Sequence, residues 1–198
     1  MREGNQRRLS EVLASLSGKQ ATEIMNLSSP APASSSAHGR SRTWERPFAD
    51  TLKINADGAF RENDKNGGWG CVIRDDNGGV LQSASGRLRF ASSPLHMEVL
   101  ACLEGVKAAV SLCLHDVCLE TDAQQVVWAV QGDEFRLSLV GGLVHNLKEI
   151  IAENFVNFHV RYVPRQCNRV AHELASIGSR SVESDSVVTA ECPIVYCT

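Results

Sequence analysis

Apolar and polar positions along the chain follow a strand-like pattern in some stretches and a helical pattern in others. Strand-like runs occupy residues 52–57, 69–74, 80–88, 117–121 and 155–163. Helical spacing predicts helices over residues 96–114, 123–131, 137–153 and 168–177. Short turns at 66–68 and 76–79 make the first three strands antiparallel, whereas the later strands return through helices and should add in parallel. The pattern therefore predicts an α/β (α+β mixed) fold with a five-stranded mixed sheet flanked by helices.

The remaining segments divide the chain into a central domain and two tails. Residues 1–43 should form a flexible arm, with a weak helical pattern followed by a linker rich in Ser, Ala and Pro. Residues 44–180 should form the domain, and residues 181–198 a poorly ordered C-terminal tail. Within the domain we expect Gly178 to end the last helix and Trp128 to lie in the core.

Composition narrows the class of protein. The hydrophobic fraction of 43% suffices for a core, and the net charge of −3 gives no global basic field. No apolar stretch approaches the length of a membrane span and the N-terminus lacks an apolar signal region, so we expect a soluble intracellular protein of unknown compartment. The seven cysteines form no Cys-x-x-Cys pair and are interpreted as reduced. The alternative, a zinc site at Cys113, His115 and Cys118, lacks a second ligand pair.

Three carboxylates stand where catalytic acids are often displayed. Asp57 and Asp122 each end a predicted strand, and Glu98 lies near the start of a long helix. If they converge, the natural partner is a divalent metal ion, and metal held by carboxylates indicates phosphate chemistry. Each also has a structural alternative. Asp57 could cap a turn at Gly58, Glu98 could be an exposed acid at a helix start, and Asp122 could be a helix N-cap.

Five motifs, in order along residues 44–178, resemble those of type 1 ribonuclease H. They are Asn55-Ala56-Asp57-Gly58-Ala59, Gly70-Cys71-Val72-Ile73-Arg74-Asp75, Met97-Glu98-Val99-Leu100-Ala101, Glu120-Thr121-Asp122-Ala123-Gln124, and Asn168-Arg169-Val170-Ala171-His172-Glu173-Leu174-Ala175. The lead-in Trp44-x-x-Pro47, with Lys53-Ile54-Asn55, is similar to a plant subgroup derived from non-LTR retroelement reverse transcriptases. The resemblance implies the RNase H-like fold.

The resemblance also implies an activity, namely a metal-dependent endonuclease that hydrolyses RNA in RNA–DNA hybrids. Two Mg²⁺ (or Mn²⁺) ions would be held by Asp57, Glu98, Asp122 and the residue at the fourth acidic position. That residue is His172, which departs from the family's usual carboxylate. Because Mg²⁺ prefers oxygen ligands, we expect weakened activity with Mg²⁺ and partial rescue by Mn²⁺. Otherwise, His172 is a surface helix residue without a metal role.

Substrate binding and the competing functions rest on fewer residues. By resemblance, Gln124 should reach the minor groove of the hybrid. Arg161 and Arg165 lie near the end of the last strand, where they would either meet phosphate or belong to a solvated face, and we assign Arg165 and Asn168 to substrate binding. The expected partner is an RNA–DNA hybrid and not a membrane, and the expected state is a monomer. A catalytically inactive nucleic-acid-binding module of retroelement origin is the main alternative. A 3′→5′ exonuclease is disfavoured because Asp57-Gly58-Ala59 lacks the Asp-x-Glu of that family.

Overall fold

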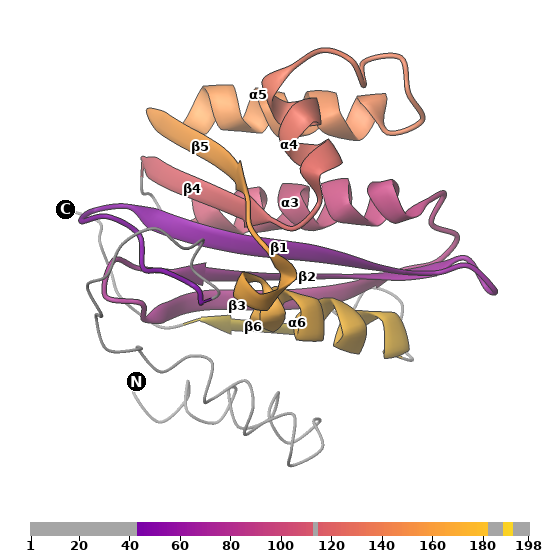
Figure 1. The fold of residues 1–198 in the computed structure, drawn as a ribbon, viewed down its shortest axis with the longest axis horizontal. Coiled ribbons are helices and arrows are strands. Elements are labelled where there is room, and N and C mark those ends of the chain that lie inside the picture. The colour runs from indigo at the N-terminus through magenta and orange to yellow at the C-terminus, as the bar shows by residue number, and fades with distance from the viewer. Residues whose placement is uncertain (1–42, 113–114, 182–187, 192–198) are drawn as a thin grey trace.

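The computed structural model describes residues 43–112, 115–181 and 188–191, and these form one mixed sheet with helices on both faces (Figure 1). The strands are β1 (Leu52–Arg61), β2 (Asn66–Arg74), β3 (Val80–Leu88), β4 (Asp116–Thr121), β5 (Asn157–Tyr162) and β6 (Val188–Glu191). The helices are α3 (Pro94–Val110), α4 (Gln124–Gln131), α5 (Gly141–Asn154), the 3-10 turn η1 (Arg165–Cys167) and α6 (Arg169–Arg180). The predicted α/β class with a mixed sheet is confirmed.

The strands run in the order β5-β4-β1-β2-β3-β6. β2 pairs antiparallel with β1 and with β3, whereas β4 pairs parallel with β1 and β5 parallel with β4. The predicted five-stranded arrangement is therefore confirmed. The structure adds one strand that the sequence pattern does not predict, β6. It lies in the segment expected to be a tail and pairs antiparallel with residues 82–85 of β3. The outer edge of β3 carries backbone groups without a partner in the five-stranded sheet, and β6 uses them.

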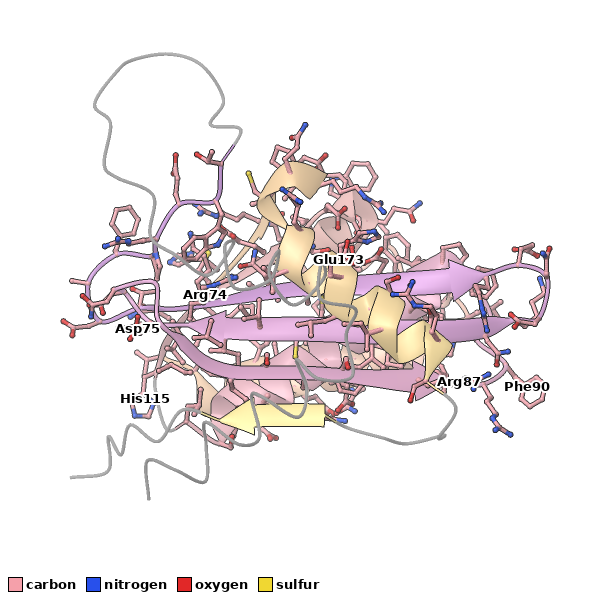
Figure 2. All side chains as sticks on the ribbon, turned by 90° about the horizontal axis from the view of Figure 1, so that it is seen from below. Arg74, Asp75, Arg87, Phe90, His115 and Glu173 are labelled. Carbon is pink, nitrogen blue, oxygen red and sulfur yellow. The ribbon has the colours of Figure 1, made fainter. Side chains whose placement is uncertain are left out.

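The alternation along β1 divides its side chains between two environments. Leu52, Ile54 and Ala56 belong to the main hydrophobic core, to which α3 contributes much of its apolar face. The intervening side chains, which include Asn55 and Asp57, lie on the opposite face, where α6 crosses the long strands (Figure 2). The same figure shows Arg74 near one end of these strands and Arg87 near the other. Polar groups are thus gathered on the face that α6 covers only in part.

Two glycines that the sequence predicts to be part of a turn and a helix stop, Gly68 and Gly178, instead allow α6 to pack closely against the sheet. The turn between β1 and β2 lies at residues 62–65, so the prediction of a turn at 66–68 is wrong. A Cβ atom on Gly68 would lie 2.2 Å from the carbonyl oxygen of Ala175 in α6. The expectation that Gly178 ends the last helix is also wrong, because α6 continues to Arg180. A Cβ atom on Gly178 would lie 2.3 Å from the carbonyl oxygen of Gly86, so this glycine lets α6 approach β3 closely.

The helix boundaries depart from the periodicity at several points. α3 begins at Pro94, two residues earlier than expected, because Ser93 caps it by accepting a hydrogen bond from the His96 backbone N–H at 3.1 Å. α5 begins at Gly141 and not at residue 137. Trp128 is 54% exposed, so its predicted core position is wrong.

Some expectations fall on parts of the chain that the structure leaves undescribed. They are the weak helix and linker within residues 1–42, the end of the predicted helix at 113–114, and tail residues 182–187 and 192–198. Among the residues described, no helix combines the length and the hydropathy needed to cross a bilayer.

Candidate metal centre and active site

The parallel pairing of β1 with β4 brings two of the three acids to the same level of the sheet. Leu52 pairs with Val117 and Asn55 with Glu120, so partners differ by 65 in residue number. The same offset carries Asp57 to the level of Asp122, just beyond the end of β4. Asp57 does not end its strand as predicted, because β1 continues to Arg61. Asp57 lies on the part of β1 that extends beyond the end of its parallel neighbour, β4.

The third acid comes from α3, and a glycine allows the helix to approach. A Cβ atom on Gly58 would lie 2.4 Å from the backbone carbon of Met97, so a larger residue there would push α3 away from β1. The Gly58 backbone N–H donates a hydrogen bond to Glu98 Oε2 at 3.1 Å. Glu98 is thereby held beside the residue that follows Asp57.

Oxygen atoms of Asp57, Glu98 and Asp122 all lie within 4.8 Å of one another. The structural alternatives for these acids do not hold. Asp57 lies inside a strand, Glu98 is half-buried, and the N-cap of α4 is Ala123. The structure therefore brings together the three acids that the sequence singled out.

Burial and mutual repulsion disfavour the ionised forms of these acids. Asp57 is 2% exposed, and burial, followed by the charge of Glu98 and then by Asp122, raises its pKa to about 9. Burial, followed by the charge of Asp122, raises the pKa of Glu98 to about 8. A bound divalent cation would reverse this balance, and clustered carboxylate oxygens are the ligands that Mg²⁺ and Mn²⁺ accept. The donor set therefore fits the expected metal.

Asn168 holds the acidic cluster from the start of α6. Its side-chain amide donates to the carbonyl oxygen of Ala56 at 2.8 Å and to Asp122 Oδ1 at 3.1 Å. The residue is 1% exposed, so it offers almost no surface to a substrate. The geometry gives Asn168 the role of orienting Asp122, while its contact with substrate stays a prediction.

His172 lies next to Asp57 and is not one of the three clustered ligands. Its Nδ1 lies 3.0 Å from Asp57 Oδ2, and Arg165 Nη2 lies 2.8 Å from its Nε2. Arg165 Nη2 also lies 3.2 Å from Nδ1, so one guanidinium nitrogen faces both nitrogens of the ring. Burial, followed by the charge of Arg165, lowers the pKa of His172, which keeps the ring neutral. His172 is therefore positioned to hold Asp57, and its predicted role as a metal ligand stays a prediction.

The remaining predicted residues lie around this centre. Arg165 is exposed, and its positive charge counteracts the raised pKa of both Asp57 and Glu98. Gln124 is the first residue of α4, is half-buried, and lines a cavity beside the β-sheet. The alternative zinc site includes Cys113, which lies outside the described residues.

Sequence reasoning missed a buried charged network on the same face of the sheet. Glu120, 1% exposed, accepts from Asn55 Nδ2 at 2.8 Å and from Arg161 Nε at 2.9 Å, and lies 3.0 Å from Lys53 Nζ. Arg74 donates to Asn55 Oδ1 at 3.1 Å. The signal was present, since Lys53, Asn55 and Asp57 alternate along one face of a strand, and a lysine on a buried face requires an acidic partner.

The arrangement of the sheet, with three acids at its parallel junction, defines an RNase H-like domain, and comparison with known proteins agrees. RNase H1 from the archaeon Halobacterium salinarum superposes with a TM-score of 0.60 at 22% identity, over 65% of this chain and 96% of that one. The N-terminal RNase H domain of a Mycobacterium tuberculosis protein gives 0.60 at 24% identity, over 65% and 93%. LC11-RNase H1, isolated from compost and solved with an RNA/DNA hybrid, gives 0.60 at 22% identity, over 65% and 96%.

The family follows from the sequence. Residues 55–178 match the family model described as reverse transcriptase-like, and the chain belongs to that family. No curated protein matches the sequence. The matched range begins at the strand that carries Asp57 and ends within α6, so it contains the whole acidic cluster and the residues that hold it.

Proposed function

We propose that this protein is a metal-dependent endonuclease that hydrolyses the RNA strand of RNA–DNA hybrids. The observation that carries the proposal is the convergence of Asp57, Glu98 and Asp122, with oxygens within 4.8 Å, on an RNase H-like fold. LC11-RNase H1, which shares this fold, has been solved with an RNA/DNA hybrid. We further propose that residues 44–180 form the catalytic domain and that it acts as a monomer.

The three acids would hold Mg²⁺ or Mn²⁺, with two ions as the expected number. When bound, divalent ions supply an activated water and stabilise charge on the leaving oxygen. Asn168 fixes the orientation of Asp122, and Gly58 fixes that of Glu98. His172 contacts Asp57 through its Nδ1. These contacts keep the acids in place before substrate arrives, which is what precise catalysis requires.

Two residues at the rim would contact the hybrid. Arg165 is exposed beside the acids and suits a phosphate of the substrate backbone. Gln124 lies at the start of α4, two positions after Asp122, and would read the 2′-hydroxyl groups of the minor groove. Neither residue carries the chemistry, so their loss should weaken binding more than turnover.

A second candidate, a nucleic-acid-binding module without turnover, is favoured by one observation. His172 stands at the fourth acidic position and bonds Asp57 and Arg165, and it is not among the clustered ligands. A neutral imidazole adds no negative charge to the site. Affinity for Mg²⁺ would then be lower than with four carboxylates.

Cleavage of a hybrid with end-labelled RNA, resolved on a denaturing gel, separates the two candidates. We expect wild-type protein to cut with Mn²⁺ and more slowly with Mg²⁺, and the Asp57→Asn variant to be inactive with either. His172→Asp should raise the Mg²⁺ rate about 10-fold, because it restores an oxygen ligand. A hybrid that is bound but uncut by wild type and by His172→Asp, in both metals, would establish the binding module.

A further inference from the structure

A cavity of about 460 Å³ lies beside the acidic cluster, between the lead-in segment and the carboxyl ends of β4 and β5. Its walls include Trp44 from the lead-in, Gln124 from α4, Arg161 and Tyr162 from β5, and Pro164, with Glu120 also in the lining. The volume falls within the range of about 300–1,000 Å³ that is typical of small-ligand sites. The site proposed above uses only Gln124 from this cavity.

Aromatic residues from two distant parts of the chain line this cavity. Tyr162, the last residue of β5, is 46% exposed. The indole ring of Trp44 is held in place by Arg74, whose guanidinium carbon lies 4.6 Å from the ring centroid, and by Lys53 Nζ at 5.2 Å. Stacking on an aromatic side chain contributes about 1–3 kcal/mol per base, and the exposed ring of Tyr162 is the surface on which a base would stack.

Arg161 is the cation in the lining of the cavity, and Glu45 and Glu120 are the acids. The side chain of Arg161 is 47% exposed, while its Nε and Nη2 donate to buried Glu120, which fixes the guanidinium. The exposed part of this guanidinium is the group that a phosphate would meet. Aromatic surface beside an anchored guanidinium is the chemistry that binds a nucleotide, since it serves the base and the phosphate together.

Several residues of the cavity lining are close in sequence to residues that form or hold the acidic cluster. Gln124 follows Asp122 by two residues, and the segment from Pro164 leads through Cys167 to Asn168, whose side chain bonds Asp122. We propose that the cavity binds one unpaired nucleotide of the strand that leaves the duplex next to the cleavage site. The protein would then prefer hybrids that end in a single-stranded extension over blunt hybrids. This inference rests on the proposed function for the identity of its substrate.

The test compares two labelled hybrids by fluorescence anisotropy in EDTA, one blunt and one with an unpaired RNA extension. A stacking contribution of about 1–3 kcal/mol corresponds to about 5- to 150-fold tighter binding of the extended hybrid by wild type. Tyr162→Ala should remove most of this preference and Tyr162→Phe should retain it, because Phe keeps the ring. Trp128→Ala is the matched control, since Trp128 is a 54% exposed aromatic residue outside the cavity and its loss should leave the preference unchanged.

The outcomes separate this inference from the proposed function. Equal affinity of wild type for both hybrids, binding of neither, or a preference that survives in Tyr162→Ala overturns the nucleotide cavity. An equal loss of preference in Trp128→Ala also overturns it. Because binding is measured without metal, a preference without cleavage leaves the cavity supported and the nuclease rejected. Cleavage of the blunt hybrid, without tighter binding of the extended hybrid, supports the nuclease and rejects the nucleotide cavity.

Discussion

Replacing Asp57 with asparagine should stabilise the metal-free protein above neutral pH, although it removes a proposed metal ligand. Asp57 is 2% exposed and shares its surroundings with Glu98 and Asp122, which together with burial raise its pKa to about 9. An asparagine amide has almost the same shape, carries no charge, and can donate toward Asp122 as a protonated acid does. The substitution therefore removes repulsion while leaving the packing intact.

The size of the effect follows from the pKa of Asp57. An acid whose pKa is raised on folding contributes stability that is complete below its unfolded pKa and is lost as pH rises toward its folded pKa. For Asp57 this window runs from 3.8 to about 9. Each pH unit within it lowers the free energy of unfolding by up to about 1.4 kcal/mol. From pH 3.8 to pH 8 the upper limit of the loss is therefore about 6 kcal/mol. Local opening of the site reduces this loss, so we expect Asp57→Asn to gain about 2 kcal/mol at pH 8, or about 4–8 °C in melting temperature.

Thermal unfolding in EDTA, followed by circular dichroism, measures this gain. The difference between variant and wild type should be small near about pH 4 and grow steadily toward about pH 8. Asp133→Asn is the control, because the Asp133 side chain is 92% exposed and its substitution should change stability by less than about 0.5 kcal/mol. Added Mg²⁺ should stabilise wild type and leave Asp57→Asn unchanged. A variant no more stable than wild type at pH 8 in EDTA would refute the reasoning.

Two further substitutions test the packing and the charged network. Gly70→Ala should destabilise the protein by about 2–4 kcal/mol in urea unfolding, because the added Cβ atom would lie 2.4 Å from the Ala175 nitrogen in α6. Gly142→Ala is the control. Its Cβ atom would meet nothing within 4 Å beyond its own helix and chain neighbours, so the substitution should be neutral or slightly stabilising. Glu120→Gln should cost about 3–5 kcal/mol in the same assay, because it leaves the buried ammonium of Lys53 without its carboxylate partner, with the Glu45 carbonyl oxygen left to accept from it. The pair of Glu104 and Lys107, in which the Glu104 side chain is half-buried and Lys107 is exposed, supplies the control, and Glu104→Gln should change stability by less than about 1 kcal/mol. Equal effects within either pair would contradict the account.

The acids of the site could be predicted from the sequence because each follows a pattern that is visible in the neighbouring residues. Asp57 and Asp122 follow alternating runs, and Glu98 follows a proline-containing helix start. Parallel pairing then forces two of them to the same level of the sheet. The order of the five central strands followed from connection lengths in the same way.

Features that depend on contacts between distant segments could not be read locally. Gly68 and Gly178 resemble turn and stop signals, and only the position of α6 against β2 and β3 shows that they permit close packing. Trp128 follows a helical period, but α4 buries Val126, Val127 and Ala129 and leaves Trp128 54% exposed. β6 pairs with residues of β3 that lie far earlier in the sequence, at 82–85. Its four residues carry too weak a pattern to predict a strand.

Binding of Mn²⁺, measured by electron paramagnetic resonance of the free ion, tests the central claim most directly because it needs no substrate and no turnover. We expect wild-type protein to bind Mn²⁺ and Glu98→Gln to bind it at least about 10-fold more weakly, since a carboxylate ligand is lost. Glu104→Gln, on the same helix and outside the cluster, should bind as wild type does. Failure of wild type to bind Mn²⁺, or equal affinity in Glu98→Gln, would contradict a metal centre formed by these three carboxylates.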